Sequence, residues 1–346
     1  METKILHVFK SVYTLPQRHF LGSTKDIRGR TEYFHERNIS YDEFLVDEKD
    51  NYRRNIALRI KDKLHEYTAA ILEMTFSPDA ASYIRRHSPN TKVLVRSHNA
   101  ELLHRWDWVR ATKLWRRSAG LLTRPIRNFL FDYFSGRRAD YVLSIDRWET
   151  NHYWMRFADE SKLKHVPFFL PEPYLSELPR NTPKELRCVN FTSSIPNPLI
   201  IDATRNFIGA VRNLNNRCKE WSFCITGDQS KFSVDSCRRI HWTGYLESPY
   251  EVLAESQAMA LLSDYGYGFK TKILEAIMAK VYILMTNGLY KRIPDEIRPY
   301  CVPVNIGSTD SFQNALEQCR EPYPEGDPNR EFRDQAFAAL DELLLK

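Results

Sequence analysis

The stretch from Met259 to Asn287 constrains the fold of this chain more than any other. Met259 to Ser263 is an apolar run typical of a buried strand, and Tyr282 to Thr286 is a second one. Between them, a bend that contains two glycines is followed by Thr271 to Ala279, whose apolar residues recur at helical spacing. This order predicts a βαβ unit within a parallel sheet.

The bend of such a unit lies at the carboxyl edge of the sheet, where open α/β sheets bind ligands. The helix that follows points unpaired backbone N–H groups toward that edge, which favours an anionic ligand. Lys272 and Glu275 are three residues apart on the first turns of this helix, so they share one face. The lysine suits a phosphate and the carboxylate suits a ribose diol, so the pair predicts a nucleotide site. A solvated surface Lys–Glu pair is the alternative interpretation.

A dinucleotide fingerprint does not fit this stretch. Thr271 stands where the third glycine of that motif belongs, and the next strand runs into Thr286 and Asn287 instead of an acidic residue. We therefore do not expect a nicotinamide enzyme.

The stretch instead resembles the donor-site signature of family 4 glycosyltransferases of the GT-B fold, many of which read Gly-Ser-Gly-Thr-Arg-Leu-Lys-Ile-Leu-Glu-Ala here. The residues that match in register are Gly266, Gly268, Lys272, Ile273, Leu274, Glu275 and Ala276. The resemblance implies an α/β protein with two Rossmann-like domains facing a central cleft. It also implies that Lys272 contacts the diphosphate of a nucleotide-sugar donor and that Glu275 contacts its ribose. Tyr267 departs from the pattern, because many members carry a glutamate there.

Further donor-side residues are expected from the same resemblance. In one branch of the family a Pro-Asn pair lies beside the donor phosphates, and the loop after Ile240 to Gly244 passes over the base. A helix cap is the alternative for the Pro-Asn pair. The donor-binding candidates are Gly266, Tyr267, Gly268, Phe269, Lys270, Pro196, Asn197, Tyr245 and Leu246.

A second motif lies in the first half of the chain. Lys92 to Ser97 is a predicted buried strand that ends in His98-Asn99-Ala100-Glu101. A histidine at a carboxyl strand edge faces the crevice and can donate or accept a proton near neutral pH. An ordinary turn is the alternative. The segment resembles Arg-x-His-Asn-x-Glu of family 4, where the histidine faces the transferred sugar.

The catalytic candidates are therefore His98, Lys272 and Glu275. On the acceptor side we consider Glu101, together with Gly22 and Arg28 in a predicted loop from Lys10 to Arg30. Family members often have a glycine-rich acceptor loop there, although the double glycine is missing here. Ala139 to Glu149 resembles the family segment Ala-Asp-x-Val-x-x-x-Ser-x-x-Glu that ends the first sheet, with Asp146 replacing the later serine.

The proline-rich segment from Leu170 to Arg187 is the best linker in the chain. We predict an acceptor-binding domain over residues 1–172, a nucleotide-sugar-binding domain over 173–330, and a helix over 331–346 that crosses back to the first domain. Other predicted strands are 5–9, 69–76, 140–145, 188–193, 221–227 and 240–244, and other predicted helices are 51–67, 80–86, 197–214 and 248–258.

Composition bounds the function further. A chain of 346 residues with 42% hydrophobic residues can bury two α/β cores. A net charge of +6 is too mild to indicate nucleic acid. The six cysteines show neither metal-site spacing nor an extracellular framework, so we expect a cytoplasmic protein without a bound metal or cofactor. No signal peptide and no run of about 18 apolar residues is apparent.

Arg105 to Arg138 departs from the rest of the sequence. Nine basic residues against Asp107 and Asp132 give it a local charge of +7, with tryptophans and leucines interleaved. This pattern suits an interfacial helix on an anionic membrane, and a solvated helix pair with core aromatics is the alternative.

Together these features predict a retaining glycosyltransferase that moves a sugar from a nucleotide-sugar to a hydroxyl of a glycan or lipid-linked saccharide. We expect it in the cytoplasm, either free or attached peripherally to the cytoplasmic face of the membrane. A nucleotide-sugar-binding protein without transfer activity, or a sugar-nucleotide epimerase on the same fold, are the alternatives.

Overall fold

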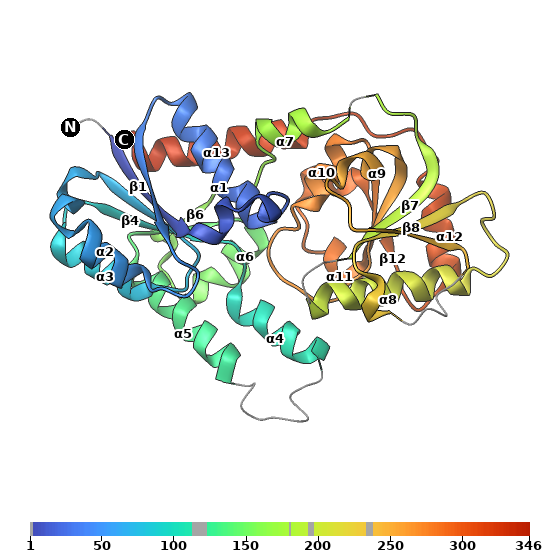
Figure 1. Cartoon of the computed structure of the whole chain (residues 1–346), viewed down its shortest axis with the longest axis horizontal. Helices are drawn as coiled ribbons and strands as arrows, with labels where there is room; N and C mark the ends of the chain where they lie inside the picture. Colours follow the sequence, from blue (N-terminus) through green and yellow to red (C-terminus); the bar gives the residue numbers. More distant parts are fainter. Residues whose placement is uncertain (1–2, 113–122, 180, 193–196, 233–237) are drawn as a thin grey trace.

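The computed structural model describes residues 3–112, 123–179, 181–192, 197–232 and 238–346. The chain forms two α/β halves, each built on a six-stranded parallel sheet (Figure 1). The first sheet has the order β2-β1-β3-β4-β5-β6. Its strands are β1 (Lys4–Lys10), β2 (Ser40–Val46), β3 (Ala69–Glu73), β4 (Lys92–Ser97), β5 (Tyr141–Ser144) and β6 (Leu163–His165).

The second sheet has the order β12-β11-β10-β7-β8-β9. Its strands are β7 (Glu185–Phe191), β8 (Ser222–Thr226), β9 (Ile240–Gly244), β10 (Ser256–Leu261), β11 (Tyr282–Thr286) and β12 (Cys301–Val304). In both sheets the central strands are apolar runs such as YILMT in β11, whose five residues are all buried. Such runs are typical of parallel strands that are covered by helices on both faces.

Helices cover both faces of each sheet (Figure 1). The α-helices of the first half are α1 (Gly22–Glu36), α2 (Tyr52–Arg59), α3 (Pro78–His87), α4 (Glu101–Thr112), α5 (Thr123–Arg138) and α6 (Arg147–His152). Those that follow are α7 (Glu172–Glu177), α8 (Pro198–Asn213), α9 (Tyr250–Glu255), α10 (Lys272–Met278), α11 (Asn287–Tyr290), α12 (Thr309–Gln318) and α13 (Pro328–Leu344). Short 3-10 helices are η1 (Ser11–Thr14), η2 (Pro16–Arg18), η3 (Lys61–Glu66), η6 (Trp154–Arg156), η7 (Glu160–Lys162), η8 (Gln229–Lys231) and η9 (Asp295–Tyr300).

Each sheet has one point where the strand order reverses. In the first sheet it lies between β1 and β3, and in the second between β7 and β10. Open α/β sheets bind ligands outside the carboxyl ends of the strands at such a point. The fold therefore offers two ligand edges, one in each half.

The last helix packs on the first half of the molecule. Phe337 of α13 lies 5.1 Å from the ring of Tyr33 in α1, and Lys92 Nζ donates to the carbonyl oxygen of Leu343 at 2.9 Å. Figure 1 shows the two chain ends close together on this half. At the start of α13 the buried Asn329 side chain donates to the Leu170 carbonyl at 3.1 Å and accepts from the Leu170 N–H at 2.6 Å. The two segments of chain that join the halves are thus tied to each other.

Most strands lie where the sequence predicts them, but one predicted loop is wrong. The segment from Lys10 to Arg30 includes the first part of α1, which begins at Gly22. The buried face of α1 carries Lys25, Asp26 and Arg30 beside its apolar residues, so it lacks a simple apolar period. The edge strand β2 was not predicted, because its first four residues are polar or aromatic and only two of its seven are buried.

Within the described part of the chain, no helix is both long and apolar enough to cross a lipid bilayer.

Candidate functional site

A cavity of about 390 Å³ lies where the carboxyl edges of the two sheets face each other. The first half lines it with residues that follow β1, β3 and β4, and the second half lines it with residues of β7, β10 and the loop before α10. These residues include Gly22, Ser23, Met74, His98, Asn99, His104, Asn190, Phe191, Asn197, Leu261, Ser263, Phe269, Lys270, Thr271 and Lys272. Both strand-order reversals therefore contribute to one cavity.

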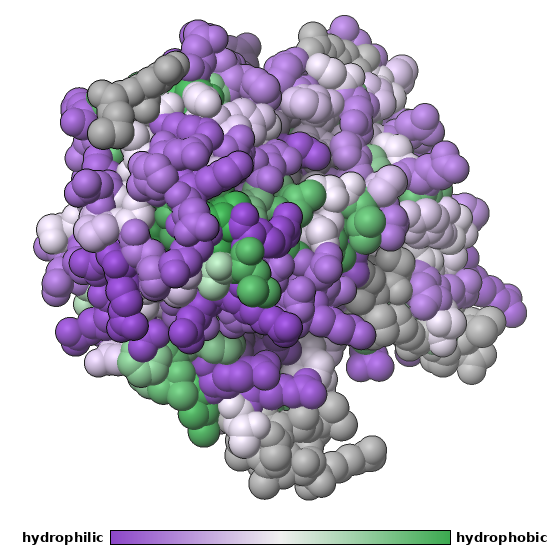
Figure 2. Space-filling view, turned by 60° about the vertical axis from the view of Figure 1, so that its left-hand side comes forward, coloured by the Kyte–Doolittle hydropathy of each residue, from purple (hydrophilic) through white to green (hydrophobic). Residues whose placement is uncertain are grey.

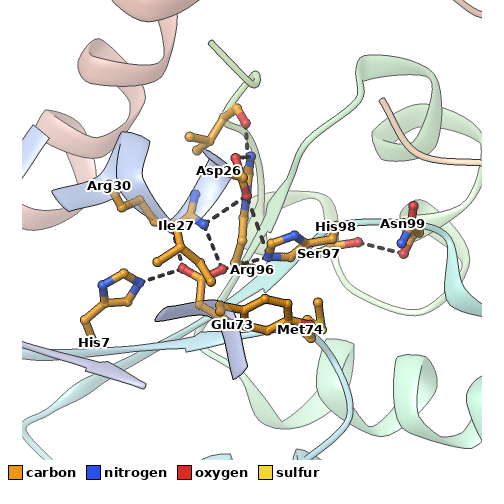
Figure 3. Close-up of polar contacts among 12 residues, drawn as sticks. His7, Asp26, Ile27, Arg30, Glu73, Met74, Arg96, Ser97, His98 and Asn99 are labelled. Carbon is orange, nitrogen blue, oxygen red and sulfur yellow. Dashed lines mark hydrogen bonds and ion pairs between the residues drawn. The ribbon is translucent and has the colours of Figure 1, made fainter. Parts of the chain in front are cut away.

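His98 enters this cavity from the end of β4 and is held by buried carboxylates (Figure 3). Its Nε2 lies 2.8 Å from Glu73 Oε2 and 3.6 Å from Asp26 Oδ2. Arg96 donates to both oxygens of Asp26, from Nε at 2.9 Å and from Nη2 at 2.7 Å. Arg30 bridges the two acids, donating from Nη2 to Asp26 at 2.9 Å and to Glu73 at 2.7 Å. The orientation of His98 is therefore fixed by a network of paired charges.

Arg30 and Arg96 also keep the two carboxyl groups of this network ionised. Burial alone would raise the pKa of Asp26 and of Glu73, but Arg30 lowers both below their usual ranges, with Arg96 also acting on Asp26. Asp26, Glu73 and His98 place ligand atoms within 4.8 Å of one another, a spacing that a metal ion could use. Two guanidinium groups already balance the two carboxylates, so this arrangement favours an ion network that positions His98.

The glycine-containing loop before α10 closes directly onto the first half. The Gly266 N–H donates to Asp107 Oδ2 at 2.9 Å, and the Gly268 N–H donates to Glu149 Oε1 at 2.6 Å. Gly268 has a φ of +83°, and a Cβ there would lie 2.1 Å from Asn99 Oδ1. Only glycine fits, both because of this backbone angle and because the loop touches the His98-Asn99 turn.

Glu149 joins the two halves at this contact. The same Oε1 also accepts from the Ala100 N–H at 2.9 Å, and burial together with the nearby Asp146 raises the pKa of Glu149 to about 8. Neither Glu149 nor Asp107 was a predicted site residue. The family-like segment that ends in Glu149 was the signal that could have identified it.

Two lysines bring positive charge to the cavity from the second half. Lys272 is half-buried, and its Nζ lies 4.6 Å from the centre of the Phe191 ring. Lys270 donates from Nζ to the Tyr267 carbonyl at 3.1 Å. Burial and the neighbouring Arg292 lower the pKa of Lys270 to about 8. Lys272 is therefore the cation better suited to a phosphate.

Glu275 has a partner that the sequence did not predict. Its Oε1 accepts from Lys25 Nζ at 2.6 Å, and the two side chains are 2% and 0% exposed. The rings of Phe20, Tyr174 and Tyr250 lie 5.3 to 5.5 Å from the same ammonium group. Glu275 is not among the residues that line the cavity. Its contact with a ribose stays a prediction.

The other candidates occupy varied places. Gly22, Asn197, Phe269 and Lys270 line the cavity, and Asn197 also caps α8 by accepting from the Leu199 N–H at 3.0 Å. The acceptor candidate Arg28 lies on α1 with its guanidinium 3.7 Å from Glu43.

Glu101 is buried and accepts from Asn99 Nδ2 at 3.1 Å, while burial and Asp132 raise its pKa to about 7. Tyr245 is 69% exposed and, like Leu246, is not among the residues that line the cavity. Pro196 lies outside the described residues.

Comparison with known proteins decides the class. Residues 188–321 match the family model described as glycosyl transferases group 1. The chain is a glycosyltransferase. The matched region begins within β7 and contains the glycine loop, Lys272 and Glu275, whereas His98 lies outside it. A search among curated proteins found no match.

Solved structures with the same fold can be aligned with nearly the whole length of this glycosyltransferase. The lipopolysaccharide outer core galactosyltransferase WaaB matches with a TM-score of 0.60 and 14% identity over 99% of both chains. The sucrose-phosphate synthase from Thermosynechococcus elongatus matches with a TM-score of 0.64 and 11% identity over 99% of this chain and 96% of that chain. HepE from Anabaena, in complex with UDP and glucose, matches with a TM-score of 0.57 and 11% identity over 99% and 96%. These likenesses confirm the predicted GT-B fold.

Proposed function

We propose that this glycosyltransferase takes its sugar from a nucleotide-sugar, with the diphosphate at Lys272 and the sugar between the glycine loop and His98. The observation that carries the proposal is the cavity, to which the second half contributes a cation and the first half a fixed histidine. The complexes of HepE with UDP and with UDP-glucose support a donor of this kind. The donor site would lie at the strand-order reversal of the second sheet, as in other α/β nucleotide sites.

We further propose membership of family 4 and transfer with retention at the anomeric carbon, on the basis of the sequence signature around Lys272. Closing the two halves over the donor would align the sugar with an acceptor hydroxyl and exclude water. Lys272 would stabilise the charge on the departing diphosphate. The acceptor would be a hydroxyl of a glycan or of a lipid-linked saccharide on the cytoplasmic side of a membrane.

The direct test has two steps. A thermal-shift screen against nucleotide-sugars identifies the donor, because a ligand that binds only the native state raises the melting temperature. Incubation of that donor with candidate acceptors, followed by NMR of the anomeric proton, then reports transfer and its stereochemistry. Donor binding without transfer to any acceptor would favour a binding protein, and isomerised free nucleotide-sugar would favour an epimerase.

We expect His98→Ala to lower turnover roughly 10- to 100-fold while leaving the affinity for the nucleoside diphosphate nearly unchanged, because the lost hydrogen bond is made to the sugar only after closure. Glu73 keeps Arg30 and His7 as partners, so the network should survive the substitution. Steady-state kinetics and calorimetry separate the two effects. The matched control is His87→Ala on the exposed surface of α3. Equal turnover of both variants would remove His98 from the site.

A further inference from the structure

Helix α5 presents an outer face composed of apolar side chains and arginines. Beyond its first residue, Thr123, the exposed residues of this helix are Arg124, Ile126, Arg127, Leu130, Phe134 and Arg137. Ile126, Leu130 and Phe134 are 59%, 42% and 36% exposed, respectively. Their spacing of four residues places them in one stripe along the helix. We call these six residues the α5 face.

The apolar stripe continues onto a neighbouring loop. Phe76 is 38% exposed, and its ring lies 6.3 Å from that of Phe131 on α5. Figure 2 shows a hydrophobic area at the lower left of the molecule, where Figure 1 places α5. Large apolar side chains gathered on a surface, rather than scattered over it, indicate an interaction site.

The charge around the stripe has one sign. Arg124, Arg127, Arg137 and Arg138 lie on α5, and within the described residues no carboxylate pairs with any of them. The single acid of the helix, Asp132, is buried, where it accepts from Thr75 Oγ1 at 2.6 Å and from the Leu102 N–H at 3.1 Å. Among the charged side chains of α5 itself, only cationic groups thus flank the stripe, while Asp79 of α3 lines a surface pocket together with Arg138.

All four arginines of α5 lie against aromatic rings. The guanidinium of Arg138 lies 4.6 Å from the ring of Phe134, and that of Arg124 lies 5.7 Å from the ring of Trp108. Trp108 is half-buried against α5, so the apolar contact surface belongs to the α5 stripe and not to this tryptophan. Of the other two tryptophans in the basic segment, Trp106 on α4 is 45% exposed and Trp115 lies outside the described residues.

We propose that the α5 face binds an anionic bilayer, with Ile126, Leu130 and Phe134 in the interfacial layer and the arginines at the lipid phosphates. A helix that combines an apolar stripe with flanking arginines lies in the plane of such a surface. The proposal rests on the proposed function, because a lipid-linked acceptor would be found at such a bilayer. Helix α4 packs against α5 and contributes His104 to the cavity wall, so a bilayer on the α5 face lies one helix away from the cavity.

The test is sedimentation of the full chain with vesicles, without donor or acceptor. We expect the parent protein to sediment with vesicles of equal parts phosphatidylglycerol and phosphatidylcholine, but not with phosphatidylcholine alone. Arg124→Glu/Arg127→Glu/Arg137→Glu should weaken this binding at least on the order of 100-fold, because each basic residue near an anionic surface contributes about fivefold. Ile126→Ser/Leu130→Ser/Phe134→Ser should also weaken it, since interfacial insertion needs the stripe. Added salt should release the parent protein.

The matched control reverses the same number of charges on the second half. Lys219, Arg238 and Lys291 are exposed there, and changing all three to Glu should leave vesicle binding unaltered. If this control lost as much vesicle binding as the arginine variant of α5, the binding would be unspecific adsorption and the proposal would be overturned. Absence of vesicle binding by the parent would also overturn it, and so would a protein dimer that the serine variant dissociates. Because the assay contains no substrates, these results are independent of whether transfer occurs.

Discussion

Lys25→Met is expected to lower the free energy of unfolding by about 3–5 kcal/mol, because it leaves Glu275 buried without its ion partner. Methionine keeps most of the apolar stem among the rings of Phe20, Tyr174 and Tyr250, so the loss reports the charge and not a cavity. Urea denaturation measures the change, and the melting temperature should fall by roughly 5 °C.

Two further variants make this prediction specific. Lys25→Met/Glu275→Leu should regain most of the stability, since an apolar pair of similar volume replaces the buried ions. Lys164 and Glu342 are also 2.6 Å apart, but their side chains are 25% and 52% exposed. Lys164→Met should therefore cost no more than about 1 kcal/mol. If the two single variants lost the same stability, the pair of Lys25 and Glu275 would have no special role.

Lys272→Ala is expected to weaken binding of the nucleoside diphosphate about 10- to 100-fold, because a charge-assisted contact to phosphate contributes about 1.5–3 kcal/mol. The complete nucleotide-sugar should lose the same factor, since the sugar is bound by other groups. Isothermal titration calorimetry with both ligands provides the comparison. Lys272 is half-buried over the Phe191 ring, so the substitution should leave the fold intact.

Lys291→Ala is the control for this measurement, because Lys291 is an exposed lysine of the same half that does not line the cavity. A selective loss for the nucleotide-sugar alone would move Lys272 from the diphosphate to the sugar. Unchanged affinity for both ligands would place the diphosphate elsewhere.

The sequence predicted the parts of the molecule that follow local patterns. The strands from Lys92 to Ser97 and from Tyr282 to Thr286 have the predicted bounds, because apolar runs suit covered parallel strands. The edge strand from Ile240 to Gly244 also has the predicted bounds, although only Ile240 in it is buried. The cavity also receives His98, which was predicted from its position after a strand, and Lys272, which was predicted from its position on the first turn of a helix.

The contacts between the two halves could not be predicted in this way. Lys25 and Glu275 are 250 residues apart in the sequence, and Gly268 is 119 residues from Glu149. Charged residues such as Lys25 and Asp26 are read as solvent-exposed unless their partners are known, since unpaired charges are rarely buried. This is why the first part of α1, up to Arg30, was taken for a loop and why Glu275 was expected to be free for a ribose.

The tie between Asn329 and Leu170 has a mechanical consequence. Because α13 returns to the first half, the chain crosses between the halves twice, and Asn329 fastens the two crossings side by side. A single connecting segment would let one half swing and twist in any direction. Two fastened segments act as a paired hinge, which permits rotation about one axis and resists torsion. The loop that contains Gly266 and Gly268 should thus make the same contacts with the His98-Asn99 turn each time the two halves close.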